Sequence, residues 1–294
     1  MIPLELLTQS IVDGLALGLI YVIAALGLSL AFGVMHVINV AHGDFIVFSA
    51  FLVYWFLLVV GSQSIVFALM ASIPVVVVLA TLGYMIQRFA VNRIIEGPPL
   101  STLLFFFGFM IMMPNLSIIL FGPYTRTLIV PELSFSYDVL GLKISASRIF
   151  SLLAAIIVIA FVLVLLYKTR IGMAIRATAQ NREAALLCGI NIKNVYSVTL
   201  ALAFALASFS GLLVGLNFAW APAHGATYTL LAFFTVVLGG MGYLPGTILA
   251  GLILGLAQTL ISMFLGTTFV YAFVFLLLYL VLLLRPKGLL GRGI

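Results

Sequence analysis

Charged residues are the scarcest feature of this chain. Only 7% of its 294 residues are Asp, Glu, Lys or Arg, with 13 basic and 7 acidic side chains. Soluble domains carry about 25% charged residues. The chain therefore lacks the polar side chains to cover a water-facing surface of its size. With 65% hydrophobic residues, it is expected to lie in a lipid bilayer, where outward-facing side chains need no water.

Cysteine is nearly absent as well. The single residue, Cys188, excludes an internal disulfide. The first ten residues contain Glu5 but no Lys or Arg, so the basic start of a cleavable signal peptide is missing and none is expected. Strict alternation of polar and apolar residues, which membrane β-strands need, is also missing from runs such as Val75 to Val78. These absences favour membrane-spanning helices.

Long apolar runs are abundant. At about 20 residues per crossing, they predict an all-α, polytopic membrane bundle of about 8–9 helices in a single domain, residues 1–294. The expected spans are 10–34, 44–60, 64–87, 101–121, 149–167, 195–217, 227–242, 244–264 and 268–284. The run 227–242 is short, and residues 36–44 fit either a re-entrant segment or a simple turn. We find no internal repeat.

Basic residues gather in three places, which the positive-inside rule assigns to the cytoplasm. They are Arg88 with Arg93, the loop from Lys168 to Lys193, and the tail with Arg285, Lys287 and Arg292. The formal charge of +6 is thereby explained without nucleic acid. The N-terminus then lies outside if the first two runs each cross once. The segment Gly122 to Arg148 also lies outside, and we expect residues 128–144 to form a short hairpin over the outer mouth.

The cytoplasmic loop 168–194 holds a short helix signal. Asn181 is a good N-cap, Glu183 falls in the first turn where the helix dipole favours an anion, and Gly189 suits the left-handed residue that ends a helix. The result is a helix of about seven residues, which is marginal alone in water. It is therefore expected to rest on something. It is either an amphipathic connector at the membrane surface or a docking helix for a cytoplasmic partner.

The densest polar group in the first third comprises Asn39, His42 and Asp44, with His36 nearby. Ionisable residues at membrane depth are costly and point to function by default. The cluster either lines the substrate path, satisfies backbone groups where a helix breaks, or forms a cytoplasmic turn. Topology places it near the cytoplasmic side. We favour a packing or gating role for Asn39 and His42.

Glycine-rich stretches point to close packing. Gly239, Gly240 and Gly242, before Pro245 and Gly246, predict a tight turn at a broken helix near the pore; with no Walker A lysine, the chain has no ATP site of its own. Four glycines spaced by four are typical of helix-packing faces: Gly211, Gly215, Gly251 and Gly255.

The remaining polar residues show no catalytic pattern. Asp13 is expected to be solvated at a membrane interface, and Asn217 and His224 to lie at the outer mouth. No metal-ligand spacing is present, and neither a bound metal nor an enzymatic activity is expected.

Four motifs resemble a known family. Glu183-Ala184-Ala185 with Gly189 is similar to the EAA-x-x-x-G signature of ABC importer permeases, although its distal Ile-x-Leu-Pro part is absent. Three stretches resemble LivH-like branched-chain amino acid permeases, in family order along the chain: 18–44, 236–246 and 284–291.

The resemblance implies a coupling helix that docks on an ATPase. Its residues would be Arg176, Asn181, Arg182, Glu183, Ala184, Ala185 and Gly189. The resemblance further implies a hydrophobic amino-acid substrate, a periplasmic binding protein, a homologous LivM-like permease subunit, and two cytoplasmic ATPases that hold the ATP and Mg. This chain would bind no cofactor and would span the bacterial inner membrane several times.

Other functions stay open at this point. Permeases for urea, short amides or other amino acids share the pattern. A secondary transporter or channel working alone is a different class, and would carry a coupling carboxylate at the bilayer midplane. Asp13, Asp44 and Glu183 fall near run ends, which counts against it. A purely structural subunit of a membrane complex leaves the capped loop helix unexplained.

Overall fold

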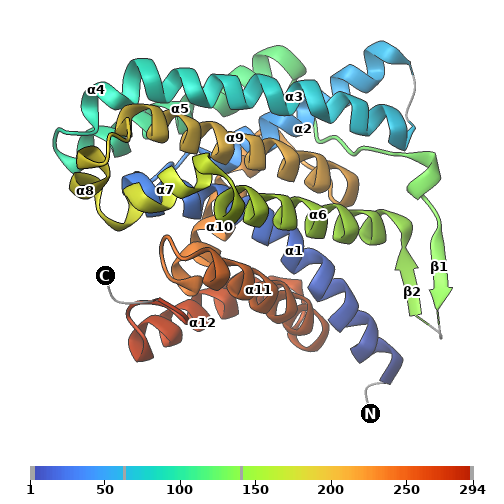
Figure 1. Cartoon of the computed structure of the whole chain (residues 1–294). Helices are drawn as coiled ribbons and strands as arrows, with labels where there is room; N and C mark the ends of the chain where they lie inside the picture. The colour runs from blue at the N-terminus through green and yellow to red at the C-terminus, as the bar shows by residue number, and fades with distance from the viewer. Residues whose placement is uncertain (1–3, 62–63, 140–141, 292–294) are drawn as a thin grey trace.

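A computed structural model describes residues 4–61, 64–139 and 142–291. Within this part of the chain, nine helices are long and apolar enough to cross a membrane, which confirms the expected helical bundle (Figure 1). Arg292, the last residue of the basic tail, lies outside the described residues.

The long helices follow the apolar runs, with ends shifted by a few residues. They are α1 (Leu4–Met35), α2 (His42–Val60), α3 (Ile65–Ile86), α5 (Pro99–Phe121), α6 (Ala146–Lys168), α9 (Ile192–Asn217), α10 (Gly225–Gly239), α11 (Leu244–Leu265) and α12 (Val270–Leu284). The short helices are the π-helical turn η1 (Gln87–Val91), α4 (Asn92–Ile94), η2 (Pro131–Leu133), α7 (Arg170–Gln180), α8 (Arg182–Leu187), η3 (Pro222–His224) and η4 (Thr267–Phe269).

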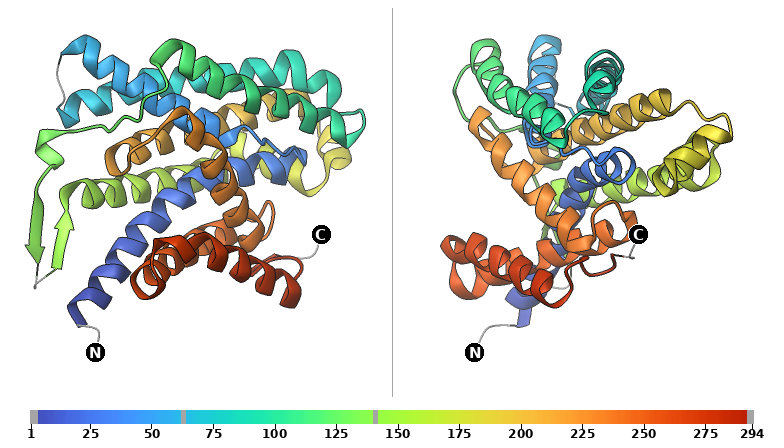
Figure 2. Two further views of the ribbon diagram at one scale, coloured as in Figure 1. Left: turned by 180° about the vertical axis from the view of Figure 1, so that it is seen from behind. Right: turned by 90° about the vertical axis from the view of Figure 1, so that its left-hand side faces the viewer.

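Helix α1 is the central element. It packs against α9, α10 and α11, and runs obliquely between the group containing α2, α3 and α9 and the pair α11 and α12 (Figure 2). Glycines allow the contact with α11, because a Cβ on Gly255 would overlap the backbone of Gly14 and Gly18. The predicted packing role of Gly255 is confirmed. Gly251 and Gly211 are similarly enclosed, against α1 and α2, whereas a Cβ on Gly215 would make only ordinary contacts.

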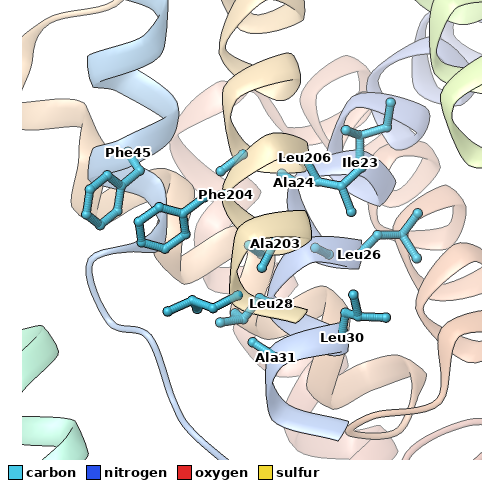
Figure 3. Packing of buried hydrophobic residues seen from close by; sticks show 14 of the residues in the cluster. Ile23, Ala24, Leu26, Leu28, Leu30, Ala31, Phe45, Ala203, Phe204 and Leu206 are labelled. Carbon is cyan, nitrogen blue, oxygen red and sulfur yellow. The ribbon is translucent and has the colours of Figure 1, made fainter. Parts of the chain in front are cut away.

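The core lies where α1, α2 and α9 meet. Phe45 of α2 and Phe204 of α9 have ring centroids 4.2 Å apart, and Ile23 of α1 lies toward the same α9, with Leu26 on another side of α1 (Figure 3). All four side chains are buried. Aromatic pairs at this separation add stability beyond simple burial, so the inner end of α2 is held firmly against its neighbours.

The two ends of the bundle differ in character. Helices α4, α7 and α8 and the C-terminus lie at one end, and the hairpin of β1 (Ser136–Val139) and β2 (Leu142–Ser145) lies at the other, with the N-terminus (Figure 1). The strands pair antiparallel, with Ser136 opposite Ser145, so a hairpin forms as predicted but begins later than the expected 128–144. The three basic segments thus share one end, as the positive-inside rule requires of a cytoplasmic face.

Candidate functional site: a broken helix and a capped cytoplasmic helix

Residues 36–41 run back into the bundle after α1 ends. His36 ends the helix with a left-handed φ of 54°, and its N–H donates to Phe32 O at 2.8 Å. Six residues later, His42 Nε2 lies 2.8 Å from Ala24 O. Ala24 sits about three helical turns, or about 16 Å, before the end of α1. The segment is therefore the extended start of the second crossing, which α2 continues toward the other end of the bundle, so it is neither a re-entrant loop nor a simple turn.

The polar cluster holds this break together. Asn39, His42 and Asp44 are all buried, with at most 3% of each residue exposed. Asn39 Oδ1 accepts the Ala41 N–H at 3.1 Å, so it satisfies a backbone donor that no helix uses. The Gly43 N–H donates to Thr229 Oγ1 of α10 at 2.8 Å. Non-helical backbone inside a membrane needs such contacts, because lipid offers no hydrogen-bond partner.

Asp44 lies where two helices begin. It belongs to the first turn of α2, and a Cβ on Gly225, the first residue of α10, would overlap its carboxylate. The positive ends of both helix dipoles favour a negative group there. Asp44 is thus deep in the bundle beside the middle of α1. The expectation that it lies near a membrane face is wrong, and with it falls one argument against an ion-coupled transporter.

Three atoms of the cluster stay unsatisfied. Among the described residues, Asn39 Nδ2, His42 Nδ1 and Asp44 Oδ2 are buried without a hydrogen-bond partner. A buried polar atom left unpaired costs about 1–3 kcal/mol. The cluster thus keeps polar atoms that can take up further hydrogen bonds.

The glycine-rich turn between α10 and α11 lies at the end of the bundle that holds the basic segments. Gly240 and Gly242 have φ values of 102° and 80°, which other residues rarely adopt. A Cβ on Gly242 would lie 2.6 Å from Gly33 Cα, and one on Gly240 would lie 2.8 Å from Gly291 Cα. Gly239 packs equally closely on Gly246. The turn is tight, as predicted, and joins the end of α1 to the C-terminal segment.

Helix α8 forms in the cytoplasmic loop with both predicted caps. Asn181 Oδ1 accepts the Ala184 N–H at 2.9 Å. At the other end Gly189 has φ 79°, its N–H donates to Leu186 O at 2.9 Å, and the Ile190 N–H donates to Ala185 O at 3.0 Å. This pair of bonds is the Schellman motif, which ends a helix at a left-handed residue.

Helix α8 presents apolar side chains to the outside. Leu187 is 91% exposed and Leu186 is 51% exposed, whereas Ala185 is buried against the bundle. Arg182 of α8 forms an ion pair with Glu96, Nη2 to Oε1 2.7 Å, which ties it to the segment after α4. A short helix fixed on one side and apolar on the other is suited to contact a partner.

Helix α7 was not expected from the sequence. Thr169 Oγ1 accepts the Gly172 N–H at 3.1 Å and caps its start, and Gly172 packs on the backbone of Leu165 and Leu166. Arg176, placed by the sequence among the coupling residues, donates from Nε to Leu166 O at 3.0 Å. It therefore ties α7 to the end of α6, whereas Asn181, Glu183 and Ala184 belong to α8 and its cap and are exposed.

The outer end also differs from expectation. Asp13 is not solvated alone: it forms an ion pair with Arg148 of α6, with only 21% of its side chain exposed. Asn217 donates to Ser151 Oγ at 2.6 Å, and the exposed His224 accepts the Ala221 N–H at 3.3 Å. Across the described residues, no three His, Cys, Asp or Glu side chains gather as metal ligands would.

These features define a multi-pass membrane protein with a broken helix at its core and a capped helix at its basic end. A family model described as "Branched-chain amino acid transport system / permease component" matches residues 10–283. The chain belongs to this family of transport permeases.

Curated relatives agree over almost the whole length. The chain is 30% identical to the high-affinity branched-chain amino acid transport system permease protein BraD of Pseudomonas aeruginosa. It is 31% identical to the corresponding protein LivH of Escherichia coli K12. Both matches cover 97% of this chain and 95% of the relative. A probable LivH of Methanocaldococcus jannaschii is 27% identical over 92% of this chain and 88% of the relative. No solved structure gives a significant match.

Proposed function

We propose that this chain moves branched-chain and other hydrophobic amino acids across the bacterial inner membrane as the permease subunit of an ABC importer. Family membership and the names of the relatives support the substrate class. The observation that carries the mechanism is α8, a helix capped at both ends whose Leu187 is 91% exposed. With Leu186, which is also exposed, Leu187 forms an apolar surface on α8 that a partner protein would cover.

The partners follow from this assignment. Two cytoplasmic ATPases would bind ATP and Mg and would hold α8, with Arg182, Glu183 and Ala184 at the contact. A periplasmic binding protein would deliver the substrate, and a LivM-like permease would form the other half of the path. Closure of the ATPases would push α8. Helix α7 would then transmit the movement to α6 through the hydrogen bond from Arg176 Nε to Leu166 O, which is 3.0 Å long.

The broken helix would serve as the gate of this path. Residues 36–41 and the turn at Gly239, Gly240 and Gly242 meet around the end of α1, since Gly242 packs on Gly33. A movement of the cytoplasmic end would therefore reach both. Asn39, His42 and Asp44, with their unsatisfied buried atoms, would exchange partners as the gate opens.

Reconstitution tests this proposal directly. The full importer in vesicles, supplied with its binding protein, is expected to accumulate labelled leucine only when the ATPases are present and ATP is hydrolysed. The variant Leu187→Asp is expected to lose most ATPase association while the permease stays in the membrane. Uptake of urea or a short amide in place of leucine would assign another substrate within the same family.

A secondary transporter is the alternative that one observation favours. Asp44 is a buried carboxylate beside the start of α10, two residues after the His42 that reaches the middle of α1, and an ion-coupling group is expected at such a depth. That function requires uptake driven by an ion gradient, without ATP and without ATPases. Uptake that follows a proton or sodium gradient in vesicles holding this chain alone would replace the importer proposal.

A further inference from the structure

A cavity of about 510 Å³ opens at the outer end of the bundle, far from α8. It lies between α1, α6, α9, α11 and α12, and its wall is polar on one part and apolar on another. The polar part includes Asp13, Arg148, Asn217 and Gln258, and the apolar part includes Leu17 and Ile20. Sites for small molecules have volumes of about 300–1,000 Å³ and combine apolar walls with a few placed polar groups.

Opposite charges are fixed at this wall. Arg148 Nη1 contacts Asp13 Oδ1, and Gln9 Nε2 donates to the same oxygen at 3.2 Å and to Lys143 O at 3.0 Å. A guanidinium has five N–H donors, and a carboxylate accepts through both oxygens. The pair therefore keeps capacity for a further anion on Arg148 and a further donor on Asp13.

Asn217 adds an acceptor that lacks a partner. Its Nδ2 donates to Ser151 Oγ at 2.6 Å and to Leu213 O at 2.8 Å, so the orientation of the amide is fixed. Asn217 Oδ1 is buried without a hydrogen-bond partner among the described residues. Gln258 is fixed as well, since its Oε1 accepts from Tyr21 Oη at 2.7 Å. Asn217 and Asp13 line the same cavity, and a cationic donor that enters it could satisfy the free oxygen of Asn217.

We propose that this cavity binds a zwitterionic amino acid on the outer side of the membrane. Arg148 binds the α-carboxylate, Asp13 and Asn217 bind the α-ammonium, and Leu17 and Ile20 contact the aliphatic side chain. The inference rests on the proposed function and deepens it, because it places substrate recognition within this chain as well as in the binding protein.

The arrangement explains why two partly buried charges are kept at the outer end of the bundle. A pair of opposite sign offers each pole of a zwitterion a charge-assisted hydrogen bond. The apolar wall favours an aliphatic side chain over a polar one. Urea and short amides carry neither pole, so this site discriminates against these two substrate classes.

Photolabelling tests the site. The full importer in vesicles is incubated with its binding protein and a leucine analogue that carries a diazirine in its side chain, and the labelled peptides are mapped. Label is expected on α1 and α11 beside the cavity, and unlabelled leucine is expected to remove it. Arg148→Gln and Asp13→Asn should each reduce labelling at least about tenfold, and Lys143→Gln on the hairpin should leave it unchanged.

Two further variants separate binding from structure. Leu17→Trp fills the cavity without removing a charge and should also abolish the label. The double variant with Asp13→Arg and Arg148→Asp restores an ion pair between α1 and α6. It should regain thermal stability but not labelling or uptake, because the two poles of the ligand then meet the wrong charges.

The outcomes are distinct. Absence of ATP-driven leucine uptake by the unaltered importer would overturn the proposed function. Normal uptake by that importer, together with full labelling and uptake in Arg148→Gln, Asp13→Asn and Leu17→Trp, would overturn this inference alone. Recovery of labelling in the charge-swapped double variant would likewise overturn the inference, because the ion pair would then have only a structural role.

Discussion

At the scale of single residues, His42 joins parts of the chain that are distant in sequence. Its Nε2 lies 2.8 Å from Ala24 O, and its ring lies where a Cβ on Gly27 would approach to 3.0 Å. The side chain is completely buried. It therefore fills the space beside α1 and also supplies a polar contact, two roles that no smaller residue can perform together.

We predict that His42→Ala lowers both stability and transport. Loss of the buried ring leaves a cavity, and the free energy of unfolding should fall by about 2 kcal/mol or more. Asn39→Ala should act in the same direction but less strongly, because it loses one hydrogen bond worth about 1 kcal/mol. Thermal unfolding in detergent and leucine uptake measure the two effects. Loss of uptake at unchanged stability would instead assign these residues to substrate contact.

Gly255 gives a second prediction at this scale. A Cβ there would overlap the backbone of Gly14 and Gly18, so Gly255→Ala must push α11 from α1, and we expect a loss of about 1–3 kcal/mol. Gly108 in α5 is the matched control, since a Cβ there meets nothing within 4 Å. Gly108→Ala should be neutral or slightly stabilising. Equal effects of the two variants on the unfolding temperature would contradict the packing argument.

At the scale of elements, α8 depends on its caps because it is only 6 residues long. Isolated helices of this length do not persist in water. The bonds of Asn181 and Gly189 to the ends of α8 therefore decide whether an ordered helix or a loose loop meets a partner.

Breaking the caps should uncouple transport. Gly189→Pro is incompatible with φ 79°, and Glu183→Arg places a cation at the positive end of the helix. Both variants should reduce leucine uptake at least about tenfold while the protein stays in the membrane at normal amounts. Gly61→Pro is the control, because proline is equally incompatible with the φ of 71° at Gly61, and Gly61 lies at the opposite end of the bundle from α8. Normal uptake by both α8 variants would remove the basis for a coupling role.

Local patterns located most elements, and long-range contacts account for what they missed. The caps of α8 were predicted because N-cap and left-handed residues act within a few positions. The depth of residues 36–41 is not predictable from the sequence, because Val37, Ile38 and Val40 are as apolar as the residues of a membrane helix. Only the bond between His42 and Ala24 sets their depth. The ion pair between Asp13 and Arg148 is not predictable from the sequence, because the residues around each one give no sign of this long-range contact.

At the scale of the whole molecule, much apolar surface stays uncovered at membrane depth. In α12 only 11% of the spanning window is buried within the chain, against 78% in α1. Lipid covers part of such a surface, and a second permease subunit would cover another part. The described residues thus form a bundle organised around α1, with outer helices available for assembly.

Co-purification tests the assembly. The chain extracted in mild detergent is expected to retain two ATPases and a second permease, and its ATPase activity should rise when the loaded binding protein is added. Isolation of a stable single chain that transports without ATP would contradict the importer assignment. Leu187→Asp is the matched control, because it should lose the ATPases but keep the second permease.

The central position of α1 has a consequence for biosynthesis. The ribosome makes α1 first, yet its neighbours α9, α10 and α11 emerge only after about two thirds of the chain. During that interval the face of α1 that carries Gly14 and Gly18 lies against lipid or an insertion factor. A nascent chain halted before Leu244 should therefore stay protease-sensitive, and folding should become cooperative only when α11 arrives.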